Sequence, residues 1–379
     1  MRGYASHVKY SPYHPLLTGI GFLSHFVIAY VYQTLKLKIP PDPQEGKMSH
    51  TLRKYNSSDA IDVVMMLNTG RAEPCAAVDS AGNIRLIRYV PMSSNKVVVE
   101  DPLGNIVGYT YVADKENSFV FEVGGGVHPE HRNMGIGSTL IKSAQEAALK
   151  LSQNAPLGVK CVLQVNIFES EQETIRLFEQ NDFMKVREWA HYDIHLKDAP
   201  MMPVLSNGLS IREFNLDNDE DWDLVGPVME EAFKDHWGAY SLPPVEYHEP
   251  EDETNEKESA EDLSFSNAQG YCFMAFIENE VAGGILCNAK LVEFQNTGRV
   301  GSVFCHPNFR RRGAGRALML SAFHAFYQSG MRRIILDTDS QSFSESSRFY
   351  TSLGMNIYRR EFLYEKEIRA GREIRRLEK

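Results

Sequence analysis

One motif occurs twice in this chain, at an offset of 178 residues, and this repeat limits the fold more than any other feature. The first copy reads His128-Pro129-Glu130-His131-Arg132-Asn133-Met134-Gly135-Ile136-Gly137-Ser138-Thr139-Leu140. The second reads His306-Pro307-Asn308-Phe309-Arg310-Arg311-Arg312-Gly313-Ala314-Gly315-Arg316-Ala317-Leu318. Self-similarity at a fixed offset indicates a repeated structural unit. The chain is therefore a tandem duplication.

Both copies show the same order of secondary-structure signals. A short strand at 51–55 or 209–214 leads into a helical stretch, then a strand pair with a turn, and then a strand that ends at Val127 or Cys305. Apolar residues at helical spacing predict helices over 136–151 and 314–328. Each helix is followed by a buried strand, a short helix and a final strand. This order predicts an α/β fold of two modules, each a mixed, partly parallel twisted sheet flanked by helices.

Composition narrows the class of protein. With 43% hydrophobic and 24% charged residues, the chain has the composition of a folded protein. Its five cysteines are odd in number and form no CxxC pair, so neither a disulfide framework nor a zinc site is predicted, and a reducing compartment is the simpler interpretation. The net charge of −10 argues against a general nucleic-acid binder, which needs a basic face.

We predict four segments: an extension at 1–47, modules at 48–200 and 205–368, and a basic tail at 369–379. The extension holds 26 uncharged residues between Lys9 and Lys36. A membrane anchor or targeting segment, a stretch upstream of a working start at Met48, and a helix packed on the main body all remain open. The body from residue 48 should fold without it. The spacing of Arg369, Arg372, Arg375 and Arg376 predicts a basic helix.

The Arg-x-x-Gly-x-Gly loop between a strand and a helix has a direct chemical use. Glycines let backbone N–H groups close around a diphosphate, and the following helix directs its positive dipole at the same anion. The loop is therefore predicted to hold a pyrophosphate. It lacks the third glycine of the dinucleotide fingerprint and the Gly-Lys-Ser/Thr of a Walker loop.

This loop resembles the signature of the Gcn5-related N-acetyltransferase (GNAT) family: a strand end, x-Pro-x-x, then Arg/Gln-x-x-Gly-x-Gly/Ala. Residues 127–137 match throughout, and residues 305–315 match with Cys at the strand end. The resemblance covers about residues 50–368, and the paired arrangement is similar to tandem acetyltransferases of the mycothiol-synthase type. It implies acetyl-CoA as acyl donor, an amine acceptor, and no metal.

The resemblance implies which residues hold acetyl-CoA. In the second copy they are Val303, Phe304, Cys305, Arg310, Arg311, Arg312, Gly313, Ala314, Gly315 and Arg316. In the first they are Gly125, Gly126, Val127, Arg132, Asn133, Met134, Gly135, Ile136, Gly137 and Ser138. The family also places a backbone oxyanion donor on a splayed strand, and the run Gly124–Gly126 suits a bulge there.

The resemblance also implies the catalytic residues. In many family members a Tyr on the last helix protonates the departing thiolate, and Tyr350 occupies that position in copy two, whereas copy one has Phe178. Glu122 is the only carboxylate on the strand before the first loop. Copy two has none between Gly298 and Pro307, so either an amine with a modest pKa or a water chain from His306 or Asp235 would have to serve there. His128 and His306 are expected to be structural.

These observations predict a cytoplasmic N-acetyltransferase that acts on a primary amine of a small molecule or peptide. The C-terminal module is expected to catalyse, with the N-terminal module as a degenerate partner. The alternative is a non-catalytic acyl-CoA-binding sensor or scaffold. The acidic insertion at 246–262, with nine carboxylates and one Lys, would attract a cationic acceptor. Membrane contact is expected only if 1–47 is an anchor. The acceptor's identity and the oligomeric state stay open.

Overall fold

The structure is a computed structural model. It describes residues 50–70, 76–78, 84–86, 95–116, 118–206, 208–234, 236–239, 271–288, 296–341 and 346–375. The predictions for segment 1–47, the acidic insertion and Asp235 lie outside these residues. Residues His50–Lys379 form one compact unit, and all the described elements belong to it.

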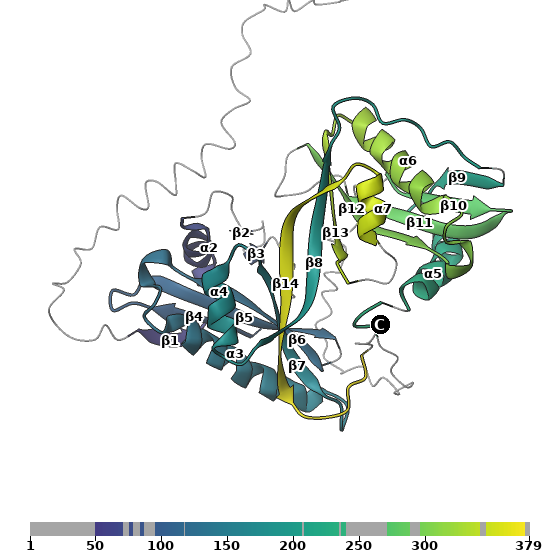
Figure 1. Cartoon of the computed structure of the whole chain (residues 1–379). Coiled ribbons are helices and arrows are strands. Elements are labelled where there is room, and N and C mark those ends of the chain that lie inside the picture. The colour runs from purple at the N-terminus through teal and green to yellow at the C-terminus, as the bar shows by residue number, and fades with distance from the viewer. Residues whose placement is uncertain are drawn as a thin grey trace, which may run out of the picture. The chain divides into compact units, whose positions relative to one another are not determined.

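Copy one contains the predicted elements in the predicted order (Figure 1). They are β1 (Thr51–Lys54), α2 (Ala60–Asn68), β4 (Asn95–Glu100), β5 (Ile106–Glu116), β6 (Val120–Val127), α3 (Ile136–Leu151), β7 (Cys161–Phe168), α4 (Gln172–Glu179) and β8 (Met184–His195). A separate two-stranded sheet joins β2 (Ala76–Val78) to β3 (Ile84–Leu86). Helix α3 has the bounds that its apolar spacing predicts.

Copy two repeats this order. Its elements are β9 (Leu209–Glu213), α5 (Asp219–Phe233), β10 (Phe273–Ile277), β11 (Glu280–Asn288), β12 (Thr297–Cys305), α6 (Ala314–Gln328), β13 (Arg333–Asp339), α7 (Ser346–Ser352) and β14 (Asn356–Arg369). Strand β12 ends at Cys305 as predicted, and α6 again has the predicted bounds. The fold class is confirmed: twisted, mixed sheet with flanking helices.

The two copies exchange their final strands within a single twelve-stranded sheet. Its order is β1-β4-β5-β6-β7-β14-β8-β13-β12-β11-β10-β9. Strand β14 of copy two pairs with β7 of copy one, and β8 of copy one pairs with β13 of copy two. Figure 1 shows these two long strands side by side between the halves. The boundary at 200–205 follows the repeat in sequence and stays a prediction, because the sheet itself runs through both copies.

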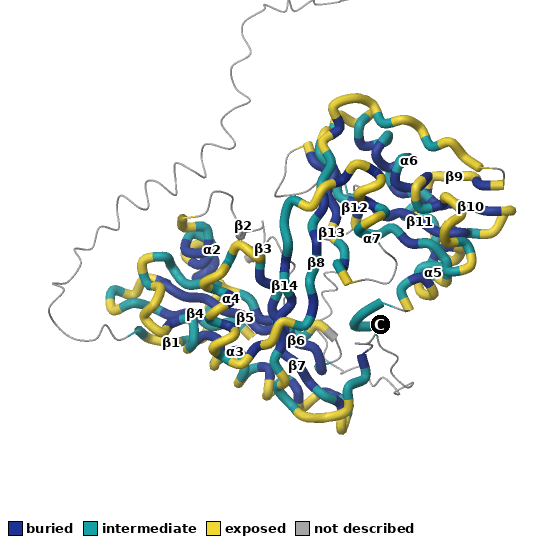
Figure 2. The backbone as a smooth tube through the Cα atoms, in the orientation of Figure 1, coloured by how far each residue is buried: buried dark blue, intermediate teal, exposed yellow. Residues whose placement is uncertain are grey.

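The strand exchange also reaches into the hydrophobic cores. Tyr192 of β8 is 1% exposed and belongs to the cluster built around α6 of copy two. Tyr364 of β14 belongs to the cluster built around α3 of copy one. Figure 2 shows buried residues along both long strands. Because a buried aromatic side chain removes about 150–250 Å² from water, each exchanged strand stabilises the copy that it enters.

The predicted basic helix at the C-terminus is wrong for the residues that the structure describes. Strand β14 continues to Arg369, and the segment from 370 to 375 is not helical. Arg375 is 7% exposed, and its guanidinium donates to the carboxylates of Glu365 (2.8 and 3.0 Å) and Glu373 (2.9 and 2.7 Å). These charge-assisted bonds anchor Arg375 to β14, and the backbone of Arg372 bonds to Gly158 and Lys160, which the arginine spacing alone does not reveal.

Candidate active site

The two glycine loops have the same backbone conformation. Each begins with a 3₁₀ turn and continues through a residue of positive φ, Asn133 (61°) or Arg311 (64°). The first glycine follows, Gly135 (82°) or Gly313 (92°), and caps the next helix. A positive φ costs an L-residue about 1–2 kcal/mol, so glycine is the residue that fits the cap.

The second glycine of each loop lies against the last helix of its copy. A Cβ on Gly137 would lie 2.7 Å from Cδ2 of Leu177, and one on Gly315 would lie 3.5 Å from Cζ of Phe349. The first N–H groups of a helix have no partners within it. Both loops therefore present amides at the start of a long helix, α3 or α6, in an arrangement that can receive a diphosphate.

The histidine that opens each loop has a local role. His128 Nδ1 accepts the N–H of Glu130 at 3.3 Å, and His306 Nδ1 accepts that of Asn308 at 3.2 Å. Each ring caps the 3₁₀ turn that follows it. This capping bond agrees with the predicted structural role of both histidines. It also makes His306 a less direct candidate for proton transfer, because its Nδ1 already accepts a hydrogen bond.

Beside each loop, two parallel strands pair briefly and then diverge. Strand β6 pairs with β7 only over Val120–Glu122, and β12 pairs with β13 only over Thr297–Arg299. The rest of β6 and β12 pairs on the other side, with β5 and β11. Each copy thus contains a splay whose open strand edge leads to the glycine loop. An extended chain with amide groups, such as pantetheine, fits an edge of this kind.

The predicted cofactor-binding residues of each copy lie on one continuous path. Gly125–Val127 and Val303–Cys305 end the splayed strands, and the loop residues follow. The arginines are exposed and contact the protein: Arg310 donates to the carbonyl oxygen of Ala232 at 3.3 Å, and Arg312 pairs with Glu278 at 3.0 Å. Arg316 donates to the carbonyl oxygen of Ser352 at 3.4 Å, which links α6 to α7.

The predicted bulge at Gly124–Gly126 is wrong. These residues pair with β5 in unbroken register. The glycines are required for close packing: a Cβ on Gly125, whose φ is +145°, would lie 2.0 Å from the carbonyl oxygen of Tyr109. The register shift near a splay is instead in copy two, where Gly301 is the extra residue between Val300 and Ser302.

Tyr350 lies in a largely apolar setting on α7. Its side chain is 7% exposed, and its ring centroid is 5.5 Å from that of Tyr192, on the exchanged strand β8. Burial raises the pKa of the Tyr350 hydroxyl, and the charge of Asp337 and the nearby Tyr192 raise it further. The hydroxyl is therefore protonated at neutral pH, which is the state a general acid needs.

Copy one differs at the equivalent positions. Phe178 is also 7% exposed, and its ring lies 4.9 Å from Phe183. Glu122 accepts a hydrogen bond from the Tyr111 hydroxyl at 3.2 Å and pairs with Lys115 at 3.4 Å. The structure does not bring Glu122 and Tyr350 together. Strands β7, β14 and β8 separate β6 from β13, about 19 Å at ~4.8 Å per strand.

Sequence reasoning missed Asp337, a carboxylate at the splay of copy two. It lies on β13 and pairs with Arg299, the last residue of β12 that pairs with β13. Its charge acts on Tyr350. The sequence signal was present, since Asp337 directly follows the predicted buried strand Ile334–Leu336. Only the fold places it beside the splay.

Neither a metal site nor a membrane-spanning helix is found in the part of the chain that the structure describes. Within it, no group of three or more His, Cys, Asp or Glu side chains is arranged to hold a metal ion. None of its helices is both long and apolar enough to cross a membrane.

Comparison with known families agrees with this geometry. The profile of the Acetyltransferase (GNAT) family matches residues 229–355, and that of the Acetyltransferase (GNAT) domain matches residues 93–185. Together the two matches cover more than half of the chain and fall one on each copy. The chain belongs to the GNAT family of acetyltransferases and carries two of its domains in tandem.

Individual relatives and solved structures are similar to this chain over most of its length. A mycothiol acetyltransferase of Amycolatopsis mediterranei is 27% identical over 274 residues, which cover 69% of this chain and 81% of the relative. A GCN5-related N-acetyltransferase structure from Sphaerobacter thermophilus is 26% identical with a TM-score of 0.66, and the match covers 86% of this chain and 97% of that one. A tandem GNAT protein from the clavulanic acid biosynthesis pathway, 18% identical with a TM-score of 0.59, shows the same fold over 86% of this chain and all of its own.

Proposed function

We propose that this protein transfers the acetyl group of acetyl-CoA to a primary amine of a small molecule or peptide, and that copy two catalyses the transfer. One feature supports the proposal: copy two combines a glycine loop, a splay and a buried tyrosine, Tyr350, whose raised pKa keeps the hydroxyl protonated at neutral pH. Copy one has the loop and the splay but Phe178 in place of the tyrosine.

The proposed donor site follows the path from β12 into α6. The amides at the start of α6 would bind the pyrophosphate, and the helix dipole would favour its negative charge. The pantetheine would lie along the open edge of β12, from Val303 to Cys305. The bulge at Gly301 supports a thioester position nearby, because a bulged residue leaves a backbone group outside the strand ladder.

The proposed chemistry needs three groups. The amine attacks the thioester carbonyl and forms the C–N bond, a backbone N–H of β12 stabilises the oxyanion, and the C–S bond then breaks. Tyr350 would donate its proton to the leaving thiolate. Asp337 would receive the proton of the attacking amine, directly or through water. Its position on β13, from which its charge acts on Tyr350, supports this role, although Arg299 donates to its Oδ1. His306 is at the loop entry, where its Nδ1 caps a 3₁₀ turn.

For copy one we propose a structural role, with CoA binding retained. Its loop has the same positive φ values as that of copy two. Its strand β8 supplies Tyr192, on which Tyr350 packs. The similarity to a mycothiol acetyltransferase supports the transfer of an acetyl group by this chain. We specify the acceptor only as a primary amine.

The test compares Tyr350→Phe with the wild-type protein. The substitution keeps the ring that packs on Tyr192 and removes only the hydroxyl. We expect kcat to fall about 10²-fold, the usual scale of general acid catalysis, with unchanged affinity for CoA. Release of free thiol from acetyl-CoA with a panel of amines measures turnover, and calorimetry measures CoA binding.

The matched control is Phe178→Tyr, which places the hydroxyl in copy one and should leave turnover unchanged. A fully active Tyr350→Phe variant would assign catalysis to another group. If the wild-type protein binds CoA but releases no thiol with any amine, the sensor function replaces the enzyme.

A further inference from the structure

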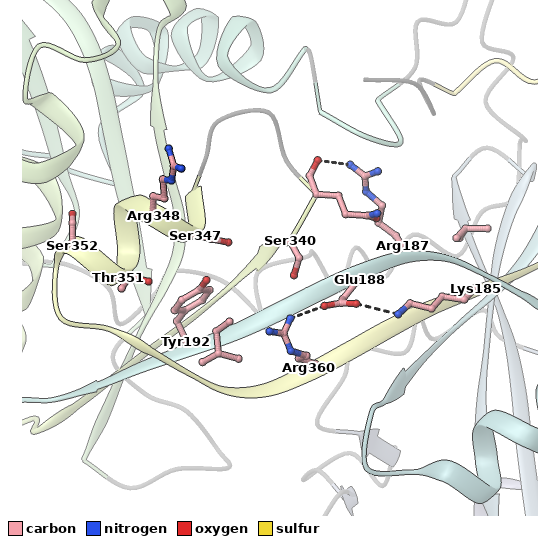
Figure 3. A pocket seen from close by; sticks show the side chains of 13 residues that line it. Lys185, Arg187, Glu188, Tyr192, Ser340, Ser347, Arg348, Thr351, Ser352 and Arg360 are labelled. Carbon is pink, nitrogen blue, oxygen red and sulfur yellow. Dashed lines mark hydrogen bonds and ion pairs between the residues drawn. The ribbon is translucent and has the colours of Figure 1, made fainter.

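A pocket of about 1010 Å³ lies where the exchanged strands meet copy two (Figure 3). Strands β8 and β14, helix α7 and the residues directly after β13 form its walls. The lining residues are Lys185, Val186, Arg187, Glu188, Tyr192, Ser340, Gln341, Ser347, Arg348, Thr351, Ser352, Ile357 and Arg360. We call it the seam pocket. Its size is at the upper end of the range for small-molecule sites.

The seam pocket is distinct from both splays. None of the loop or splay residues assigned to acetyl-CoA lines it. It is located where β13 ends, because β13 pairs with β8 only as far as Asp339 opposite Trp189. Strand β8 extends beyond this pairing to Met184, and a register shift against β14 leaves Val186 without a paired residue on that strand. Backbone groups at a bulge are available to a ligand.

Positive charge dominates the lining, although the chain as a whole carries a net charge of −10. Four lining side chains are cationic, Lys185, Arg187, Arg348 and Arg360, and Glu188 is the one carboxylate among them. Glu188 accepts from Arg360 at 2.6 Å and from Lys185 at 3.0 Å, as Figure 3 shows. One carboxylate between two cations leaves this wall of the pocket with positive charge that an anion would balance.

Arg187, which precedes Glu188 on β8, is held in a fixed orientation. Its Nε donates to Oδ1 of Asp339 at 3.1 Å and its Nη2 donates to Oδ2 at 2.8 Å, so the pair is bidentate, and Nη2 also donates to the carbonyl oxygen of Gln341 at 3.2 Å. The side chain is 9% exposed. The neighbouring Ser340 hydroxyl is buried and has no hydrogen-bond partner among the described residues. A buried hydroxyl without a partner costs about 1–3 kcal/mol, which a ligand oxygen would recover.

We propose that the seam pocket binds a small ligand with two or more oxyanion groups, either phosphates or carboxylates. Arginine side chains recognise both groups, because their N–H donors match two oxygens at once. The hydroxyls of Ser340, Ser347 and Thr351 would donate further hydrogen bonds. Tyr192 connects this ligand to the proposed catalytic residue, since its ring lines the pocket and packs on Tyr350.

The test measures binding of pyrophosphate, citrate and fructose 1,6-bisphosphate to the full chain by calorimetry. Saturating CoA is present throughout, so that the glycine loops are filled and report no binding of their own. We expect at least one of the three anions to bind, and Arg348→Gln and Ser340→Ala each to weaken that binding at least 5-fold. Comparing pyrophosphate with citrate distinguishes phosphate from carboxylate ligands.

The matched control is Arg176→Gln, since Arg176 on α4 is the copy-one counterpart of Arg348 and does not line the pocket. It should leave anion binding unchanged. The proposal fails if no anion binds in the presence of CoA, or if Arg348→Gln and Arg176→Gln weaken binding equally. Arg348 and Arg176 are both exposed, so neither change should unfold the protein. Anion binding does not require turnover, so this result is independent of the proposed acetyl transfer.

Discussion

Gly313 connects backbone conformation to function at the scale of one residue. Its φ of 92° excludes most side chains, yet a Cβ at this position would have Cδ2 of Leu209 as its nearest neighbour, at 3.9 Å, so space is not limiting. Asn tolerates positive φ better than other non-glycine residues. We therefore expect Gly313→Asn to retain most CoA affinity. Gly313→Asp, of nearly equal size, should lose affinity at least 10-fold, because its carboxylate would repel the diphosphate.

Calorimetry with CoA measures both variants, and thermal unfolding shows that both remain folded. Equal affinities for the Asn and Asp variants would mean that the loop is only a helix-start turn. The same pair of substitutions at Gly135 reports whether copy one binds CoA.

Single residues were predictable from sequence where a local motif defines them. The positive φ at Gly135 and Gly313 follows from a turn that must enter a helix, and the capping histidines follow from their place before Pro. The pairing of Asp337 with Arg299 spans 38 residues and depends on how two strands diverge. No spacing rule contains that information. The same holds for the separation of Glu122 from Tyr350.

At the scale of elements, a buried ion pair joins the two copies where β8 meets β13. Arg187 and Asp339 are 8% and 7% exposed. Arg187→Met would leave the Asp339 carboxylate buried without its partner, and this should lower the free energy of unfolding by about 3–5 kcal/mol. Adding Asp339→Leu should recover most of that loss, because two apolar side chains remove both buried charges. Urea unfolding of the wild type, the two single variants Arg187→Met and Asp339→Leu, and the double variant measures the coupling energy of the pair. If the two single losses simply add in the double variant, the pair does not stabilise the seam.

Elements with strong periodicity were predicted at their observed bounds, as α3 and α6 show. Apolar residues at helical spacing bury one face of each helix on the sheet. The C-terminal arginines also have helical spacing, but a helix there would separate Arg375 from Glu365 and Glu373. The run Gly124–Gly126 suggested a bulge because glycine permits one. It is instead explained by packing: a Cβ on Gly124 would lie 2.5 Å from the Tyr111 ring.

At the scale of the whole molecule, the strand exchange is the feature that the sequence does not reveal. A tandem repeat predicts two self-contained modules, and β8 and β14 each follow the short helix of their own copy, as a self-contained module requires. Which strand enters which copy is decided by pairing between residues far apart in sequence, such as Arg333 with His195 and Arg369 with Cys161. Neither copy is complete without the other.

Two truncations test this interdependence. A chain that begins at Met48 keeps all twelve strands of the large sheet and should unfold with the cooperativity and the CoA affinity of the full chain. A chain that begins at Leu205 loses β8, so that β13 loses a neighbour along its whole length and Tyr350 loses Tyr192. An open edge and an exposed core face should leave it aggregated or without a cooperative transition. Co-expression of residues 48–204 should restore solubility and cooperative unfolding. Thermal unfolding and calorimetry measure these outcomes, and a chain from Leu205 that unfolds cooperatively and binds CoA by itself would show that the exchanged strands are dispensable.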